Sequence, residues 1–271
     1  MASLGVEGDK YRSYMTGEGE KNTKWNFGAT PSYDVDNKLF EEGRTKIWPP
    51  GSLEEEVQNL VKTWEMELFH KSNPDDFKTL DPNKYTVSVN GRKGINIEEI
   101  GKIGGGYNSF LQTSLPEKLR GYNPDEETAE SSLKAFTTTF PRGFALEVLQ
   151  VYSGPPEIVY KFRHWGYMEG PFKGHAPTGE MVEFFGMAVF TSNIDISPFV
   201  FLTTLNYDFI ITHIKENPNK LTKQVDEHKK IVKVEFFYDP GQLVGGLLKG
   251  AKLGNSSEET TSTCPVLRST G

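Results

Sequence analysis

The sequence predicts an α+β fold in which helices pack on one side of a curved, mostly antiparallel sheet. Two observations support this prediction. Apolar residues at helical spacing are concentrated between residues 52 and 140, and segments rich in valine, isoleucine and aromatic residues follow from residue 144 onward. Helices followed by strands, in place of a regular alternation of the two, are typical of α+β proteins.

The first element with a clear start signal is a helix that begins after Ser52. Ser52 and Glu55 have the spacing of a capping box, in which the serine accepts a hydrogen bond from an early backbone N–H and the glutamate reaches back. Apolar residues from Leu53 to Leu68 then recur every three or four positions and form one helix face. We expect Pro74 to lie beyond the end of this helix.

Residues 1–51 precede this helix and have neither helical nor strand periodicity. We expect an irregular N-terminal arm that lies over the core and is anchored by Trp25 and Trp48. Disorder of the beginning of this arm is the alternative, because its composition is rich in glycine and charged residues.

An early strand and two more helices follow. Residues 85–89 are rich in β-formers and run into Asn90-Gly91, which predicts a strand that enters a turn. A second helix is predicted over residues 96–112, although Gly104–Gly106 weakens its middle. A third helix is predicted over residues 123–140, with an asparagine as its cap and a proline at its first helical position.

The remaining predicted elements are strands. A turn at residues 153–156, which contains one glycine and two prolines, joins the first two of them into a hairpin. The predicted strands span residues 144–152, 157–167, 181–190 and 231–238.

Composition excludes several classes of protein. The chain has 271 residues and a net charge of −7, without a basic patch, so we expect no binding to nucleic acid. The single cysteine, Cys264, cannot form an intrachain disulfide or a cysteine zinc site. The most apolar window, residues 199–214, is too short and too polar to span a bilayer, and the N-terminus lacks an apolar signal segment. We therefore expect a soluble cytoplasmic protein without a membrane partner.

The sequence contains no convincing nucleotide-binding or metal-binding motif. Residues 101–106 (GKIGGG) resemble a nucleotide loop, but no strand precedes them and the usual lysine-serine ending is missing, so helix packing or a kink is the better interpretation. The five histidines have no paired spacing, so we expect no metal site, and no cofactor motif is present.

Three strings carry a resemblance to a known family: residues 170–179 (GPFKGHAPTG), 182–190 (VEFFGMAVF) and 232–239 (VKVEFFYD). Residues 84–87 (KYTV) and 106–108 (GYN) agree with it as well. Over most of residues 20–250 the chain resembles the plant pathogen-related protein family, within the SnoaL-like branch of the nuclear-transport-factor-2-like superfamily. The resemblance implies a cone of helices against the sheet, with an apolar pocket at its open end. The family name refers to induction by pathogens and supplies no chemistry.

The related SnoaL-like cyclases use an aspartate near the end of the last strand as an acid/base group, with a histidine nearby. Asp239 occupies that position, and His164 and His175 are the candidate histidines. On a regular strand, however, Asp239 points away from the apolar face, and it precedes Pro240-Gly241, where an aspartate commonly caps a turn. His164 shares the apolar face of its strand, where a hydrogen-bonded core histidine is the alternative. His175 lies in a glycine-rich crossing.

Three functions compete at this point. The first is a pocket that binds a small apolar molecule in plant defence. The second is a cofactor-independent cyclase, isomerase or dehydratase that works by acid/base catalysis, and the residues do not decide whether such chemistry exists. The third is a module that forms a homodimer through its sheet face, as the resemblance implies. The candidate ligand-binding residues are Trp64, Tyr107, Tyr160, Phe162 and Phe185.

The domain is expected to comprise residues 52–190 and 225–250. Residues 191–224 interrupt the family pattern, and they are either a retained intron in the gene model or a genuine lid or interaction loop. The serine- and threonine-rich tail over residues 251–271 is expected to be disordered.

Overall fold

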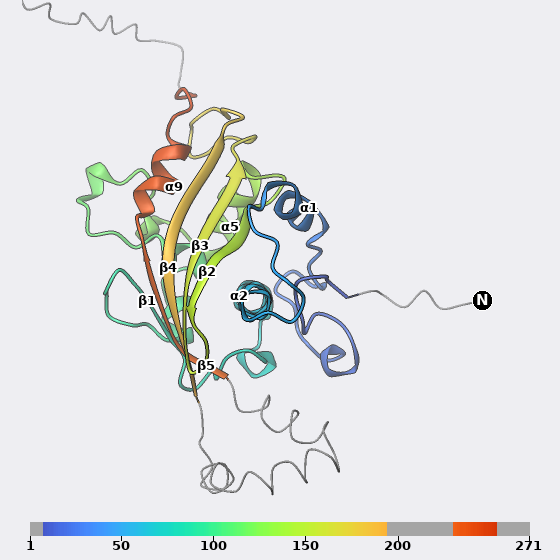
Figure 1. Cartoon of the computed structure of the whole chain (residues 1–271). Helices are drawn as coiled ribbons and strands as arrows, with labels where there is room; N and C mark the ends of the chain where they lie inside the picture. The colour runs from blue at the N-terminus through green and yellow to red at the C-terminus, as the bar shows by residue number, and fades with distance from the viewer. Residues whose placement is uncertain (1–7, 194–229, 254–271) are drawn as a thin grey trace, which may run out of the picture.

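The computed structural model describes residues 8–193 and 230–253, which form a sheet with helices on one of its faces. The sheet has five strands in the order β1-β5-β4-β3-β2, and only β1 and β5 pair in parallel (Figure 1). The strands are β1 (Thr86–Val89), β2 (Ala145–Ser153), β3 (Glu157–Tyr167), β4 (Met181–Asn193) and β5 (Lys230–Tyr238). The predicted α+β class and the mostly antiparallel sheet are confirmed.

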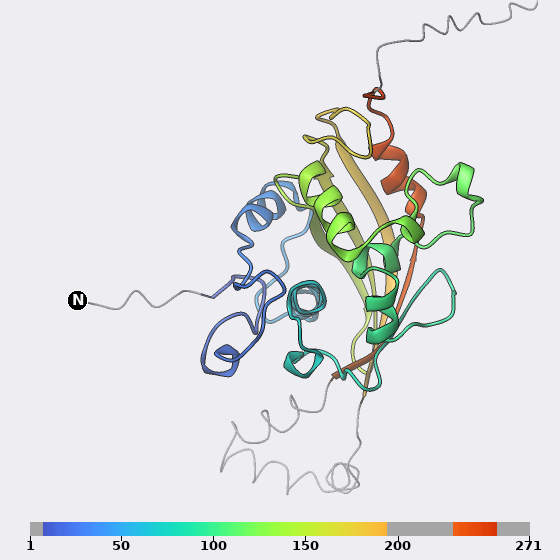
Figure 2. The same cartoon turned by 180° about the vertical axis from the view of Figure 1, so that it is seen from behind.

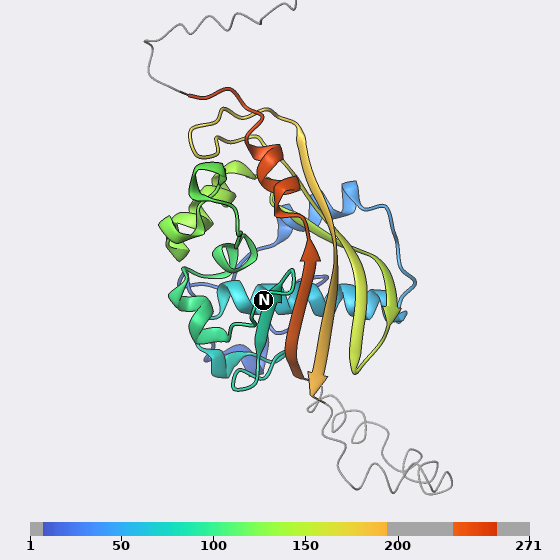
Figure 3. The same ribbon diagram turned by 90° about the vertical axis from the view of Figure 1, so that its left-hand side faces the viewer.

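Except for α1 (Asp34–Gly43), which packs on Trp165 of the opposite face, the helices lie against one face of this sheet. In Figure 2 the helix α5 (Ala129–Thr139) lies in front of the strands and α2 (Leu53–His70) is seen end-on beside them, and Figure 3 shows the strands and α5 on opposite sides of the molecule. The short helices α3 (Ile97–Lys102) and α4 (Gly106–Phe110) connect the region of β1 to α5, and α9 (Pro240–Leu247) follows β5. None of the helices in the described ranges is long and apolar enough to cross a membrane.

Helix α2 is the central helix of the cone. It begins as predicted, because the Ser52 hydroxyl accepts a hydrogen bond from the backbone N–H of Glu55. The Glu55 carboxylate, however, accepts from Gly51 and not from the cap residue. Its apolar face packs on the sheet, where Trp64 meets Phe190 with ring centroids 5.1 Å apart.

The N-terminal arm is more ordered than the sequence suggested. The helix α1 (Asp34–Gly43) lies within it, so the prediction of an irregular arm is wrong for these residues. Leu39 and Phe40 of α1 are buried against Trp165. Only three apolar residues occur on this ten-residue helix and two of them are buried, which is too short a signal for periodicity analysis. Trp48 anchors the arm as expected, since its indole N–H donates to the backbone oxygen of Val148 at 3.0 Å.

Two predicted helices also differ from the structure. The helix predicted over residues 96–112 is wrong as a single element, because Gly104 and Gly105 adopt φ values of 85° and 88° and separate α3 from α4. A Cβ at Gly106 would lie 2.5 Å from the Phe69 ring, so the glycine-rich motif serves close packing. Residues 124–126 form only one 3-10 turn, and α5 begins five residues later than predicted, behind the cap of Thr128.

The strands agree with the prediction to within a few residues. Asn193 at the end of β4 pairs with Lys230 at the start of β5, so the described residues on both sides of the interruption lie next to each other. The proposed insertion lies outside the described residues except for residues 191–193, which extend β4. The tail also lies outside them from residue 254 onward.

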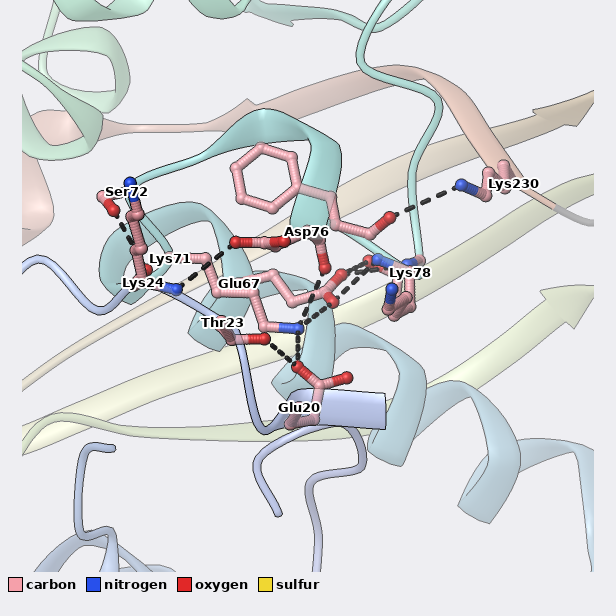
Figure 4. A network of polar contacts seen from close by, with 11 residues as sticks. Glu20, Thr23, Lys24, Glu67, Lys71, Ser72, Asp76, Lys78 and Lys230 are labelled. Atoms are coloured by element: carbon pink, nitrogen blue, oxygen red, sulfur yellow. Dashed lines mark hydrogen bonds and ion pairs between the residues drawn. The ribbon is translucent and has the colours of Figure 1, made fainter. Parts of the chain in front are cut away.

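A buried ionic network joins the arm, α2 and the segment before β1 (Figure 4). The Lys71 ammonium lies 2.9 Å from a carboxylate oxygen of Glu67 and 2.9 Å from one of Glu20, and it donates to the backbone oxygen of Asp76 at 3.1 Å. The Glu67 carboxylate also accepts hydrogen bonds from Thr79, through both its backbone N–H and its hydroxyl. The side chains of Lys71 and Glu67 are completely buried.

We expect Lys71→Met to destabilise the protein by about 3–5 kcal/mol, because it leaves two buried carboxylates without their cation. Urea denaturation of the variant and the wild type measures this loss. Lys102→Met is the matched control, because it breaks the exposed pair with Glu98, and it should leave the denaturation midpoint unchanged. Equal effects of the two substitutions would contradict a structural role of the network.

Candidate functional site

A cavity of about 390 Å³ lies between the sheet and the helices that cover it. Its floor comes from β3, β4 and β5, and its walls come from α2, α4 and α5. The exposed lining residues Val35, Thr137 and Pro141 place its mouth between the start of α1 and the end of α5. The arm therefore contributes directly to the site.

Most of the cavity wall is aromatic. Tyr107 of α4 stacks on Phe136 of α5 with ring centroids 4.3 Å apart. Phe162 of β3 and Phe236 of β5 form the floor from either side of β4, with centroids 5.9 Å apart. Such a surface favours a flat or branched apolar molecule, because aromatic walls offer both apolar area and ring-to-ring contact.

His164 lies among these rings and is the one predicted catalytic residue that reaches the cavity. Its imidazole stacks between Phe144 and Phe184, with centroid distances of 5.3 and 5.2 Å. Burial, together with the charge of Lys62, lowers the pKa of His164 to about 3. Its buried Nδ1 has no hydrogen-bond partner in the described structure. His164 is thus a neutral imidazole near pH 7 that can form a hydrogen bond with a ligand but cannot supply a proton as imidazolium.

The part of the lining near the arm is ionic. Lys62 and Glu65 come from α2, and Asp36 and Arg12 come from α1 and the segment before it. Lys62 and Glu65 are three residues apart on one helix, so their side chains are neighbours. Burial raises the pKa of Glu65 and of Asp36, and the nearby Arg12 opposes this effect at both carboxyls.

Lys62 is the most unusual member of this group. Its side chain is buried, with 1% of the residue exposed, and its ammonium lies 3.7 Å from the centre of the Phe40 ring. No hydrogen bond or ion pair of this nitrogen occurs among the described residues. Burial and the charge of Arg12 lower the pKa of Lys62 to about 7. A large share of this amine is therefore neutral and nucleophilic at physiological pH.

The other predicted ligand-binding residues divide into two groups. Trp64, Tyr107 and Phe162 line the cavity. Tyr160 is completely buried in the core beside it, and Phe185 is 41% exposed on the outer face of the sheet. Side chains alternate along β4, so its inward neighbour Phe184 takes the place predicted for Phe185.

Asp239 and His175 lie away from the cavity lining. Asp239 is exposed and caps α9, where its carboxylate accepts a hydrogen bond from the backbone N–H of Gly241 at 2.8 Å. This is the turn role that the sequence offered as the alternative. His175 holds the glycine-rich crossing to the segment after α9, with its Nδ1 2.8 Å from the backbone oxygen of Gly250.

The sequence analysis missed the ionic group because two of its members belong to the arm, which has no periodicity. One signal was nevertheless present in α2. Lys62 and Met66 are four positions apart and therefore lie on the same face of the helix. A methionine on that face, outside the apolar stripe, indicates that the face is not simply exposed to solvent. Met66 is completely buried, which shows that the arm covers the outer face of α2.

The pKa of Lys62 predicts a specific pH dependence. Between its folded value of about 7 and the ordinary value of 10.5, the unfolded chain binds more protons at this residue than the folded chain. The free energy of unfolding should therefore rise with pH in this window, by up to about 1.4 kcal/mol per pH unit. Lys62→Met removes this contribution, so the stability of the wild type relative to the variant should increase from about pH 7.5 to about pH 9.5. A stability difference that stays constant in urea denaturation over this range would contradict the assignment.

Comparison with known proteins agrees with the sequence resemblance. No protein-family model matches the chain. Among solved structures, it is similar to a protein from Jannaschia sp. provisionally described as a SnoaL-like polyketide cyclase, with 14% identity, a TM-score of 0.35 and coverage of 76% of this chain and 99% of the other. A protein from Acidithiobacillus ferrooxidans, provisionally described as a polyketide cyclase, has 12% identity, a TM-score of 0.36 and coverage of 75% and 100%.

One curated protein is much more similar. The chain is 47% identical over 270 residues to the pathogen-related protein of Hordeum vulgare, and the alignment covers 99% of each chain. At this identity and coverage, the chain belongs to the pathogen-related protein family.

Proposed function

We propose that this protein binds a small, mainly apolar molecule in the cavity between its sheet and helices, as part of a defence-associated role. The observation that carries the proposal is the cavity itself, about 390 Å³ in volume, with aromatic walls and an ionic group near the arm. This volume lies within the range of small-molecule sites, which combine apolar walls with a few polar groups that orient the ligand.

The distribution of polar groups indicates how such a ligand is oriented. Its apolar body would lie on Phe162 and against the stacked pair of Tyr107 and Phe136, because these side chains line the cavity. Its polar end would face Lys62 and Glu65. A single oxygen-bearing group is the simplest complement to an amine and a carboxyl group at this end.

The defence role and the location have separate support. The defence role rests on membership of a family whose barley relative is described as pathogen-related. The cytoplasmic location rests on the single cysteine in the sequence, which is typical of proteins in reducing compartments. Induction of the transcript by infection, and microscopy of a tagged chain, measure the two directly.

A second candidate function is acid/base catalysis in the same cavity. The observation that favours it is the neighbouring pair Lys62 and Glu65, whose pKa values burial moves toward each other, an arrangement that suits one group to accept and the other to donate a proton. This assignment uses neither Asp239 nor a charged histidine.

The homodimer stays a proposal as well. Phe185 of β4 and Phe237 of β5 are 41% and 44% exposed on the outer face of the sheet, and Met181 of β4 is 39% exposed. Apolar side chains gathered on one open face are typical of an interaction surface. Sedimentation equilibrium that gives the monomer mass at every concentration would contradict this proposal.

The binding proposal predicts saturable binding of a neutral aromatic probe such as N-phenyl-1-naphthylamine, measured by its fluorescence. Leu133 lines the cavity near its mouth, so Leu133→Trp should weaken probe binding by about tenfold or more, because the larger ring occupies ligand volume. Phe185→Ala is the matched control on the outer face and should leave affinity unchanged. Probe binding that is absent, or that is equally strong in Leu133→Trp, would contradict the cavity as the site.

The catalytic alternative predicts proton exchange. In D₂O the protein should accelerate deuterium incorporation next to the carbonyl group of a cavity-bound ketone, measured by mass spectrometry. Glu65→Gln should lower this rate by a factor of about 100, the usual contribution of one acid/base group. Asp239→Ala should leave it unchanged. Exchange that depends on Asp239 and not on Glu65 would overturn this assignment and restore the one suggested by the family.

A further inference from the structure

Two buried lysines, Lys62 within α2 and Lys71 at its C-cap, occupy opposite environments. Lys71 is saturated, with two carboxylates and a backbone oxygen around its ammonium. Lys62 lies nine positions earlier, is equally buried, lines the cavity and has no polar partner within hydrogen-bond distance among the described residues. A lysine that only stabilises the fold would be expected to resemble Lys71, because a buried ammonium without acceptors is costly.

We propose that Lys62 is a covalent binding site for carbonyl compounds, at which its amine condenses with an aldehyde or ketone held in the cavity to form a reversible imine. This inference rests on the proposed binding function and names the class of ligand for the same cavity. Apolar aldehydes and ketones with an aromatic or branched body fit it best, because the remaining walls are aromatic.

The surroundings of Lys62 supply what imine formation needs. The neutral amine attacks the carbonyl carbon, and a proton moves from nitrogen to oxygen to give a carbinolamine. Its hydroxyl group then leaves as water, with a proton from a nearby acid, as the C=N bond forms; hydrolysis reverses each step. Glu65 lies one turn from Lys62, and burial raises its pKa, which favours the carboxylic acid form that this step requires.

The product fits the site better than the free ammonium does. An ammonium carries three N–H donors, whereas an iminium carries one and an imine carries none. The wall around Lys62 offers the face of the Phe40 ring and the carboxyl groups of Glu65 and Asp36. One donor can be satisfied by one of these carboxylates, so condensation lowers the number of unsatisfied donors in the buried site.

A competing explanation is that Lys62 simply packs on Phe40 as a cation over an aromatic ring. That contact favours the charged amine. The pKa of Lys62 is nevertheless lowered to about 7, because burial and the repulsion from Arg12 outweigh the attraction of the carboxylates of Glu65, Asp36 and Asp9. The ring therefore holds the side chain in position while the amine remains reactive.

The test is reductive trapping. The full-length wild-type protein is incubated with cinnamaldehyde and sodium cyanoborohydride near pH 7.5, and peptide mapping by mass spectrometry locates the alkylated lysines. Lys62 should be labelled about tenfold faster than exposed lysines such as Lys161, because its neutral fraction is far larger. Lys71 should stay unlabelled, since its amine is enclosed and paired. Cinnamyl alcohol, which has no carbonyl group, should slow the labelling of Lys62 by competition.

Two further measurements separate the proposals. Displacement of N-phenyl-1-naphthylamine from the wild type reports whether cinnamaldehyde enters the cavity at all. Entry with labelling of Lys62 no faster than that of Lys161 would overturn the imine site and leave the binding function intact. Absence of binding by the probe and the aldehyde alike would overturn both. Lys62→Arg keeps the charge but cannot form an imine, so this variant should lose the fast labelling. Fast labelling of another residue in Lys62→Arg would also overturn the assignment.

Discussion

The structure depends on the ionic network at the end of α2. Glu67 is completely buried and accepts hydrogen bonds from Lys71 and from the backbone that leads toward β1, while Lys71 also reaches Glu20 in the arm. The distant arm therefore meets the end of α2 and the segment that follows it at one pair of side chains. Such a network gains little free energy overall, but it excludes other placements of the arm, because any of them would leave a buried charge unpaired. The position of the arm in turn completes the cavity.

In this arrangement α2 contributes to both the core and the ionic part of the cavity. One part of its surface contributes Trp64 and Val61 to the core, and another carries Lys62 and Glu65 toward the cavity. Because the arm covers the remaining surface, the helix has almost no face in water. Lys62 is thereby desolvated without receiving the carboxylate that Lys71 receives, and the same fold that pairs one lysine leaves the other reactive.

The sequence predicted the periodic part of the structure and missed the rest for identifiable reasons. The start of α2 and all the strands have local signals, so they were found to within a few residues. The helix α1 buries only Leu39 and Phe40, a contact that exists only once Trp165 is in place. Phe185 and Phe184 are adjacent and chemically identical, so only the register of β4 with β3, in which His164 pairs with Phe184, decides which ring faces the cavity. The ionic site combines residues of the arm and of α2, so no pattern within one segment of the sequence predicts it.

Substitutions in the aromatic part and in the ionic part of the cavity should therefore have different effects. The aromatic part is made of strand and helix residues whose apolar character also builds the core, so a change there alters stability and binding together. The ionic part owes Arg12 and Asp36 to the arm, and neither residue belongs to the main hydrophobic core. A chain with this fold can therefore change which polar group it recognises through its arm while it keeps the sheet and α2. In the proposed binding function, the polar specificity of the cavity would depend largely on the arm, the segment whose sequence reveals least about its structure.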